Sequence, residues 1–183
     1  MVDIAQFEPM RRFEPAVLAE IIREGEARLN TQLQIANAAD GRALSIAGFE
    51  TTAATAALGA GIALAGGDHK DLWLTILALI FSVVMVATAM LAVSTVRPAR
   101  FSVPGNNPKN WLPDQWLGRQ SGDYSLIQAR VEQAACLEAA IADNMRWIEK
   151  AGIRVRLSID LALGAVAVAG VAMLGTLIVR SMS

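Results

Sequence analysis

The chain has one cysteine and one histidine among 183 residues, and these shortages argue against disulfide bonds, cysteine–histidine catalysis and histidine-based metal sites. Cys136 cannot form an internal disulfide, and no histidine lies near it in sequence to activate a nucleophile, so we expect a small packing residue. A metal site at His69 would need further ligands, so we expect a residue of a solvated turn. The sequence also lacks a glycine-rich phosphate loop, a Ser/His/Asp set and metal-ligand spacing. We therefore expect no enzyme, no cofactor and no metal site.

Charged residues are missing from long stretches of the chain. Leu72–Val96 and Leu161–Val179 contain none, and Ala43–Gly67 contains only Glu50. A run of about 20 apolar residues is long enough for a helix to cross the hydrocarbon core of a bilayer. Buried helices of a soluble protein are the alternative, but three such runs in one short chain favour a membrane. The sequence predicts an all-α membrane protein with three transmembrane helices, at residues 43–67, 72–96 and 157–180.

The basic residues are unevenly distributed around these expected spans. Of 16 Lys and Arg residues, only Lys70 and Arg180 lie beyond the far ends of the spans. Because positively charged loops stay on the cytoplasmic side, residues 1–42 and 97–156 are predicted to be cytoplasmic. The turn near Asp68 and the C-terminus at Ser183 would then face outward.

The two cytoplasmic regions each contain a predicted amphipathic helix. Apolar residues recur at helical spacing in Pro15–Ala36 and again in Leu126–Ile148. The second helix is expected to continue through Lys150, Arg154 and Arg156 into the third span as one helix, with Gly152 as the point where it would bend. Residues 97–123 contain four prolines and predict an irregular segment at the membrane interface, with Trp111 and Trp116 at headgroup level. Two tryptophans with few cations make base stacking the weaker alternative, so we expect no nucleic-acid partner.

Polar residues mark the entry to the first expected span. Asn37, Asp40 and Arg42 precede it, and Glu50 lies about 10 Å further along the helix than Ala43. Two interpretations of the entry stay open: a plain membrane boundary, or a joint that passes a trigger to the span. Glu50 likewise has two: a gate or polar pathway, or a neutral glutamic acid in an interhelical hydrogen bond.

Small residues form ladders in the first and third spans. Gly48, Thr52, Ala56 and Gly59 recur at about four-residue spacing, and the third span contains Gly164 and Gly170. In lipid, small residues at such spacing let helix backbones approach closely. We therefore expect the lipid bilayer as one partner, and either a homo-oligomer or docking on a larger membrane complex.

Two parts of the sequence resemble one family. Asn37-x-x-Asp40-x-Arg42-Ala43 resembles the N-x-x-x-D-x-[KR]-A entry of small bacterial transmembrane effectors of Pycsar anti-phage systems, and of related two-span effectors of nucleotide-signalling operons. The segment Ile141–Ala151, which includes Asn144, Trp147 and Lys150, resembles the family's helix ahead of the last span. The resemblance extends from about Leu29 to Leu174. Arg42 replaces the usual lysine, and Ala151 replaces the aromatic residue that usually follows a lysine.

The resemblance implies an oligomeric effector of the bacterial inner membrane that responds to a cyclic pyrimidine nucleotide and impairs the membrane of an infected cell. Asn37, Asp40, Arg42 and Glu50 are then the candidate trigger and gate, and Asn144, Trp147 and Lys150 couple the cytoplasmic helices to the spans. Two alternatives remain open: a structural or accessory subunit of a larger membrane complex, and a small channel or transporter that uses Glu50.

Overall fold

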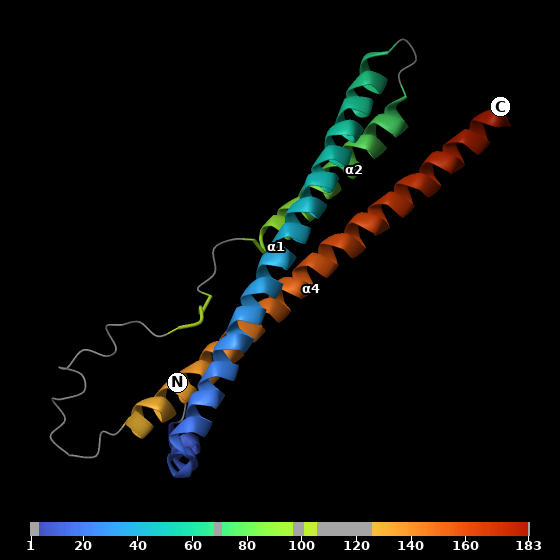
Figure 1. The fold of residues 1–183 in the computed structure, drawn as a ribbon. Helices are drawn as coiled ribbons and strands as arrows, with labels where there is room; N and C mark the ends of the chain where they lie inside the picture. The colour runs from blue at the N-terminus through green and yellow to red at the C-terminus, as the bar shows by residue number, and fades with distance from the viewer. Residues whose placement is uncertain (1–3, 68–70, 97–100, 106–125, 183) are drawn as a thin grey trace. The chain divides into compact units, whose positions relative to one another are not determined.

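The computed structural model describes residues 4–67, 71–96, 101–105 and 126–182, and contains helices without strands in these ranges (Figure 1). The elements in chain order are η1 (Ile4–Arg12), α1 (Pro15–Gly66), α2 (Leu72–Val93) and α4 (Leu126–Ser181). The all-α expectation is confirmed at this level. Expectations for the turn at His69 and for Trp111 and Trp116 concern residues outside the described ranges.

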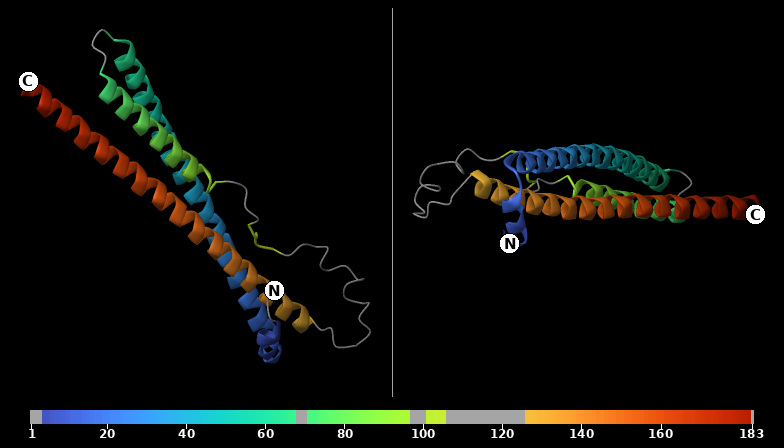
Figure 2. Two further views of the ribbon diagram at one scale, coloured as in Figure 1. Left: turned by 180° about the vertical axis from the view of Figure 1, so that it is seen from behind. Right: turned by 60° about the horizontal axis from the view of Figure 1, so that its bottom comes forward.

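Two helices are unusually long and unbroken. α1 has 52 residues and α4 has 56, and each runs without interruption in both views of Figure 2. Proline occurs in α1 only at its first residue, Pro15, where a missing N–H costs least, and is absent from α4. α1 therefore passes through Gly41 and α4 through Gly152 without a break, so the expected continuation of α4 into residues 157–180 is confirmed.

The chain divides into two compact units, which we describe separately. The first unit comprises Met1–Asn37 and Ala99–Glu149, and the second comprises Ala38–Pro98 and Lys150–Ser183. This division rests on contacts within the chain, so the membrane boundaries expected after residues 42, 96 and 156 stay predictions. Both α1 and α4 contribute to both units.

The first unit packs the N-terminal parts of α1 and α4 around a small core. Phe7, Leu18, Val131 and Ala135 are buried together, with Met10 and Ile127 against them. The N-terminal segment forms η1 and places Phe7 in this core. Its anchor is a contact with residues more than 100 positions away, which local periodicity could not indicate.

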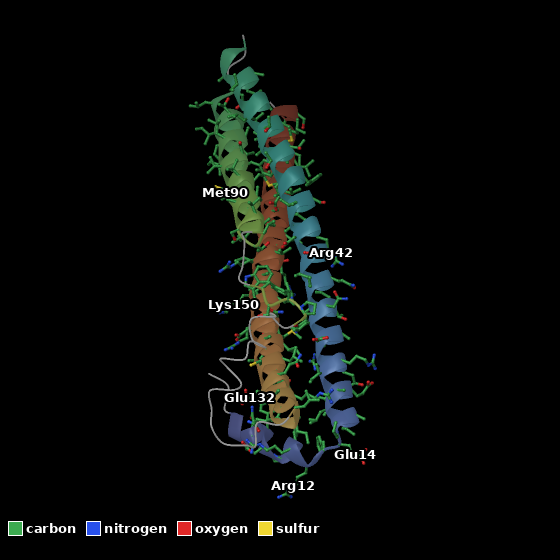
Figure 3. The ribbon with its side chains drawn as sticks, turned by 60° about the vertical axis from the view of Figure 1, so that its left-hand side comes forward. Arg12, Glu14, Arg42, Met90, Glu132 and Lys150 are labelled. Carbon is green, nitrogen blue, oxygen red and sulfur yellow. The ribbon has the colours of Figure 1, made fainter. Side chains whose placement is uncertain are left out.

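The second unit contains α2 beside the C-terminal parts of α1 and α4, and its polarity is inverted relative to a soluble protein. The three hydroxyl residues of α2, Thr75, Ser82 and Thr88, are all buried. Large apolar side chains of α2 are exposed instead, among them Val83 (68%) and Met90 (69%), and Met90 points away from α1 and α4 in Figure 3. Apolar side chains outside and hydroxyl groups inside suit a hydrocarbon surrounding.

In the ranges that the structure describes, two helices are long and apolar enough to cross a membrane: α2, and α4 with its apolar run at Leu161–Val179. Asp71 caps the start of α2 by accepting a hydrogen bond from Leu74 N at 3.2 Å. The expected first span, residues 43–67, does not qualify by the same measure among the described residues. Glu50 and the neighbouring threonines and glycines lower its hydropathy, so the structure supports two of the three expected spans by composition.

Candidate functional site

In the second unit, α1 has an inward stripe of small side chains that includes one carboxyl group. Ala43, Ala47, Glu50 and Ala54 are at most 5% exposed, and their spacing of three or four residues puts them on one helix face. Further along, a Cβ added at Gly61 would lie 3.4 Å from the Cβ of Ala78, so α2 approaches closely there. Because Glu50 shares a helix face with Ala43, Ala47 and Ala54, it lies in the interior and is only 1% exposed.

Three helices meet at Glu50. The Oγ of Ser158 on α4 lies 3.0 Å from Oε1 of Glu50 and 3.1 Å from the main-chain oxygen of Thr88 on α2. Ser158 and Thr88 are both fully buried, and the Thr88 hydroxyl donates to the Met85 carbonyl. We call Glu50, Thr88 and Ser158 the three-helix junction. It joins α1, α2 and α4 through polar contacts in the interior of the second unit.

The second carboxyl oxygen of Glu50 is buried without a hydrogen-bond partner among the described residues. A carboxyl group removed from water is stable only when it is neutral, paired or hydrated. No group of three or more His, Cys, Asp or Glu side chains in the described ranges could hold a metal ion. The junction therefore offers no visible ligand set in the described residues, and its chemistry is that of one acid and two hydroxyl groups.

A second polar contact holds α2 to α1 near the junction. The Ser82 hydroxyl donates to the Ala54 carbonyl at 2.9 Å, and Ala47 packs on Ala89 and Ala92. Such a bond from a buried hydroxyl to a helix carbonyl fixes both the rotation and the height of one helix against the other. The mutual position of α1 and α2 around Glu50 is thus determined at two levels.

The expected entry residues do not gather into a cluster. Asn37 and Arg42 are exposed, and Arg42 projects outward in Figure 3. Asp40 is half-buried and forms no ion pair with Arg42 in the part of the chain that the structure describes. Neither interpretation of this entry, boundary or trigger joint, is decided by these positions.

In the first unit, Asn144 clamps a distant segment onto α4. Its Oδ1 accepts from Ser102 N at 3.0 Å, and its Nδ2 donates to Ser102 O at 2.9 Å. Asn144 is 2% exposed, so both main-chain groups of Ser102 find their partner on one buried amide. The expected coupling residue therefore fixes the chain that follows α2.

Trp147 supports the same clamp, and Lys150 does not take part in it. The ring of Trp147 meets Phe101 edge to face with centroids 5.7 Å apart. Lys150 belongs to the second unit and is exposed. Of the three expected coupling residues, two thus hold residues 101–102, and the third lies on the surface (Figure 3).

A further buried polar contact joins α1 to α4 in the first unit. Gln32, 3% exposed, donates a hydrogen bond from its Nε2 to the Ile141 carbonyl at 3.1 Å, and its Oε1 is buried without a partner among the described residues.

On the surface of α1, Arg23 bonds to Glu20 at 2.8 Å, and this hydrogen bond lowers the pKa of the Glu20 carboxyl. An ion pair so exposed adds little stability.

The expected packing glycines are open in the single chain. A Cβ added at Gly48, Gly59, Gly164 or Gly170 would meet nothing within 4 Å. Thr52 and Ala56 are exposed, and a shallow pocket lies at Thr51, Thr52, Thr55 and Ala56. These ladders therefore do not pack α1 or α4 inside the described chain, and their role in association between chains stays a prediction.

Sequence reasoning singled out Glu50 and Asn144 but missed their partners. Ser158 bonds to Glu50, 108 positions away, and to Thr88, 70 positions away, and Ser102 bonds to Asn144, 42 positions away. The contact of Gln32 with Ile141, 109 positions away, was missed as well. One signal was available: Thr75, Ser82 and Thr88 recur at six- or seven-residue spacing in an otherwise apolar helix, which puts them on one face. Comparison of the chain with protein-family models, curated proteins and solved structures gives no match.

Proposed function

We propose that the chain is a non-catalytic, triggered effector of the bacterial inner membrane. In this proposal it spans the membrane three times, at residues 43–67, 72–96 and 157–180, and assembles with copies of itself. Its N-terminus and residues 97–156 are cytoplasmic and its C-terminus is outside. A cyclic pyrimidine nucleotide is the proposed trigger, and a permeabilised membrane is the result. The resemblance at Asn37–Ala43 and Ile141–Ala151 motivates the trigger and the outcome.

The observation that carries the proposal is the continuity of α1 and α4. Each is one helix that contributes to both units, and no proline interrupts either after its first residue. A shift of one helix against the other in the first unit is therefore transmitted along both helices, because helices move as stiff elements. In the second unit the same two helices are joined at Glu50 and Ser158. The three-helix junction would be the contact that such a shift breaks.

Reconstitution of the full chain into liposomes that contain a self-quenching dye tests the proposal. We expect cyclic CMP or cyclic UMP to release the dye and cyclic AMP to have no effect. Asp40→Ala should abolish the response while the particle keeps its mass, and Glu24→Ala, at an exposed acid of the same helix, serves as the matched control. Intact liposomes in both pyrimidine nucleotides, together with an unchanged membrane potential in infected cells that express the chain, would reject the effector proposal.

An accessory role is the second candidate, because the ladders at Gly48 and Gly164 are open to another chain of any kind. Co-purification of the chain in fixed ratio with a larger membrane complex, without dye release, would favour this role. The channel alternative needs water to reach Glu50, which is 1% exposed in this structure.

A further inference from the structure

With an ionised Glu50, the three-helix junction would have too few donor hydrogens to satisfy the acceptors around Ser158. The Ser158 hydroxyl has a single hydrogen to donate and lies within hydrogen-bond distance of two acceptors, Oε1 of Glu50 and the Thr88 carbonyl. If Glu50 were a carboxylate, its Oε1 and the Thr88 carbonyl oxygen would compete for that one hydrogen. If Glu50 carries a proton, it donates to Ser158, and Ser158 donates to Thr88. The neutral acid satisfies both contacts at once.

Apart from the neutral hydroxyls of Ser158 and Thr88, the described surroundings of Glu50 hold nothing that would stabilise a negative charge. Oε2 has no partner among the described residues, and a buried carboxylate with one hydrogen bond is far more costly than a buried neutral acid. The Thr88 hydroxyl, the other neutral group beside Glu50, donates its hydrogen to the Met85 carbonyl at 2.9 Å.

Among the side chains that the structure describes on α1, α2 and α4, no charged group reaches Glu50. α2 contains no titratable side chain between Leu72 and Val93. The nearest charged residues of α1 are Asp40 and Arg42, two or more turns away. On α4, Arg154, Arg156 and Asp160 are all exposed, and Arg156 lies 3.8 Å from Asp160.

We propose that Glu50 is a proton-binding site, which holds the proton while the three-helix junction is closed and releases it when α1 and α4 separate. On opening, the O–H bond of the Glu50 acid breaks, the proton passes to an entering water molecule, and a hydrated carboxylate remains. The opening step rests on the proposed function, whereas the protonated closed state stands on the junction geometry alone. Because the closed state binds the proton more tightly, raising the pH favours the open state.

Infrared spectroscopy of the full chain in lipid nanodiscs tests the closed state. A protonated carboxyl group has a carbonyl stretching band well separated from carboxylate bands. We expect such a band at neutral pH in the unmodified chain and its complete loss in Glu50→Gln. The matched control is Asp160→Asn, which removes an exposed acid from α4 in the same unit and should leave the band in place.

Ser158→Ala provides a second arm that does not depend on the folding of Glu50→Gln. It removes the hydrogen-bond acceptor of the acid, so the band should persist and shift in frequency. Absence of the band at neutral pH, or its survival in Glu50→Gln, would overturn the proton site. A band without any dye release would instead reject the effector function and leave the proton site intact, so the two failures are distinguishable.

Discussion

At the scale of single residues, the two buried polar side chains Asn144 and Glu50 differ in how completely they are hydrogen-bonded. Asn144 satisfies two main-chain groups of Ser102 and is satisfied by them in return. In the described parts of the chain, Glu50 has one oxygen bonded to the Ser158 hydroxyl and the other without a partner. A buried amide with all its hydrogen bonds stabilises one arrangement, whereas a buried acid with only one of its oxygens bonded loses little when its contact opens. We therefore expect the clamp at Asn144 to be permanent and the three-helix junction to be the part that opens.

The clamp leads to a prediction about Asn144→Asp. The substitution keeps the shape of the side chain but replaces the Nδ2 donor with an acceptor that faces the Ser102 carbonyl. We expect the free energy of unfolding of the first unit to fall by about 1–3 kcal/mol, the cost of a buried unpaired group. Hydrogen exchange at the Ser102 amide should accelerate accordingly. Asn37→Asp makes the same change at an exposed position and should not alter that exchange; equal effects of both variants would contradict the clamp.

At the scale of elements, the sequence predicted what depends on local periodicity. The stretches without charge and the helical spacing of apolar residues indicated long helices, and α1, α2 and α4 confirm them. Glu50 stood out because an acid in an apolar stretch needs an explanation. Its partner Ser158 could not be predicted, because the rotation of one helix against another is set by contacts between residues 108 positions apart. The packing of η1 on α4 was missed for the same reason.

The orientation of these helices is a further prediction, and it follows from the basic residues around them. In a Cys136→Ala background, a thiol placed at Asp68 or Ser183 should react with a membrane-impermeant reagent in intact cells, and one at Asn106 should not. Permeabilised cells supply the control, since all three thiols should then react. Equal labelling of the three in intact cells would show that the predicted topology is wrong.

At the scale of the whole molecule, the second unit exposes the small-residue ladder of α1 and a groove between α2 and α4, and the two lie at similar positions along the helices. Glu50 contacts Ser158 with an offset of 108 positions, and α1 and α4 run in the same direction (Figures 1 and 2). The same offset puts Thr52 of α1 level with Asp160 of α4, and Ala56 level with Gly164. An apolar groove of about 340 Å³ lies between α2 and α4 at that level, lined among others by Phe81, Asp160, Gly164 and Val168.

If copies of the chain assemble in one membrane by rotation about the membrane normal, every residue keeps its own depth in each copy. The open ladder of α1 in one copy would therefore meet the groove of the next copy at the same level, and the threonine hydroxyls would face Asp160. Close approach there needs small residues on both sides. We predict that Gly48→Leu or Gly164→Leu weakens self-association about tenfold or more, the equivalent of about 1.4 kcal/mol from overpacking.

The particle mass in detergent, measured over a range of protein concentrations, checks this prediction. Gly66→Leu is the matched control, because Gly66 is equally open but lies at the end of α1, beyond the ladder. Its mass should equal that of the unmodified chain at every concentration, while Gly48→Leu and Gly164→Leu should dissociate on dilution. If both ladder variants kept the unmodified mass, association would have to use other faces. The exposed aliphatic residues of α2 and α4 would then be left to lipid or to a different partner.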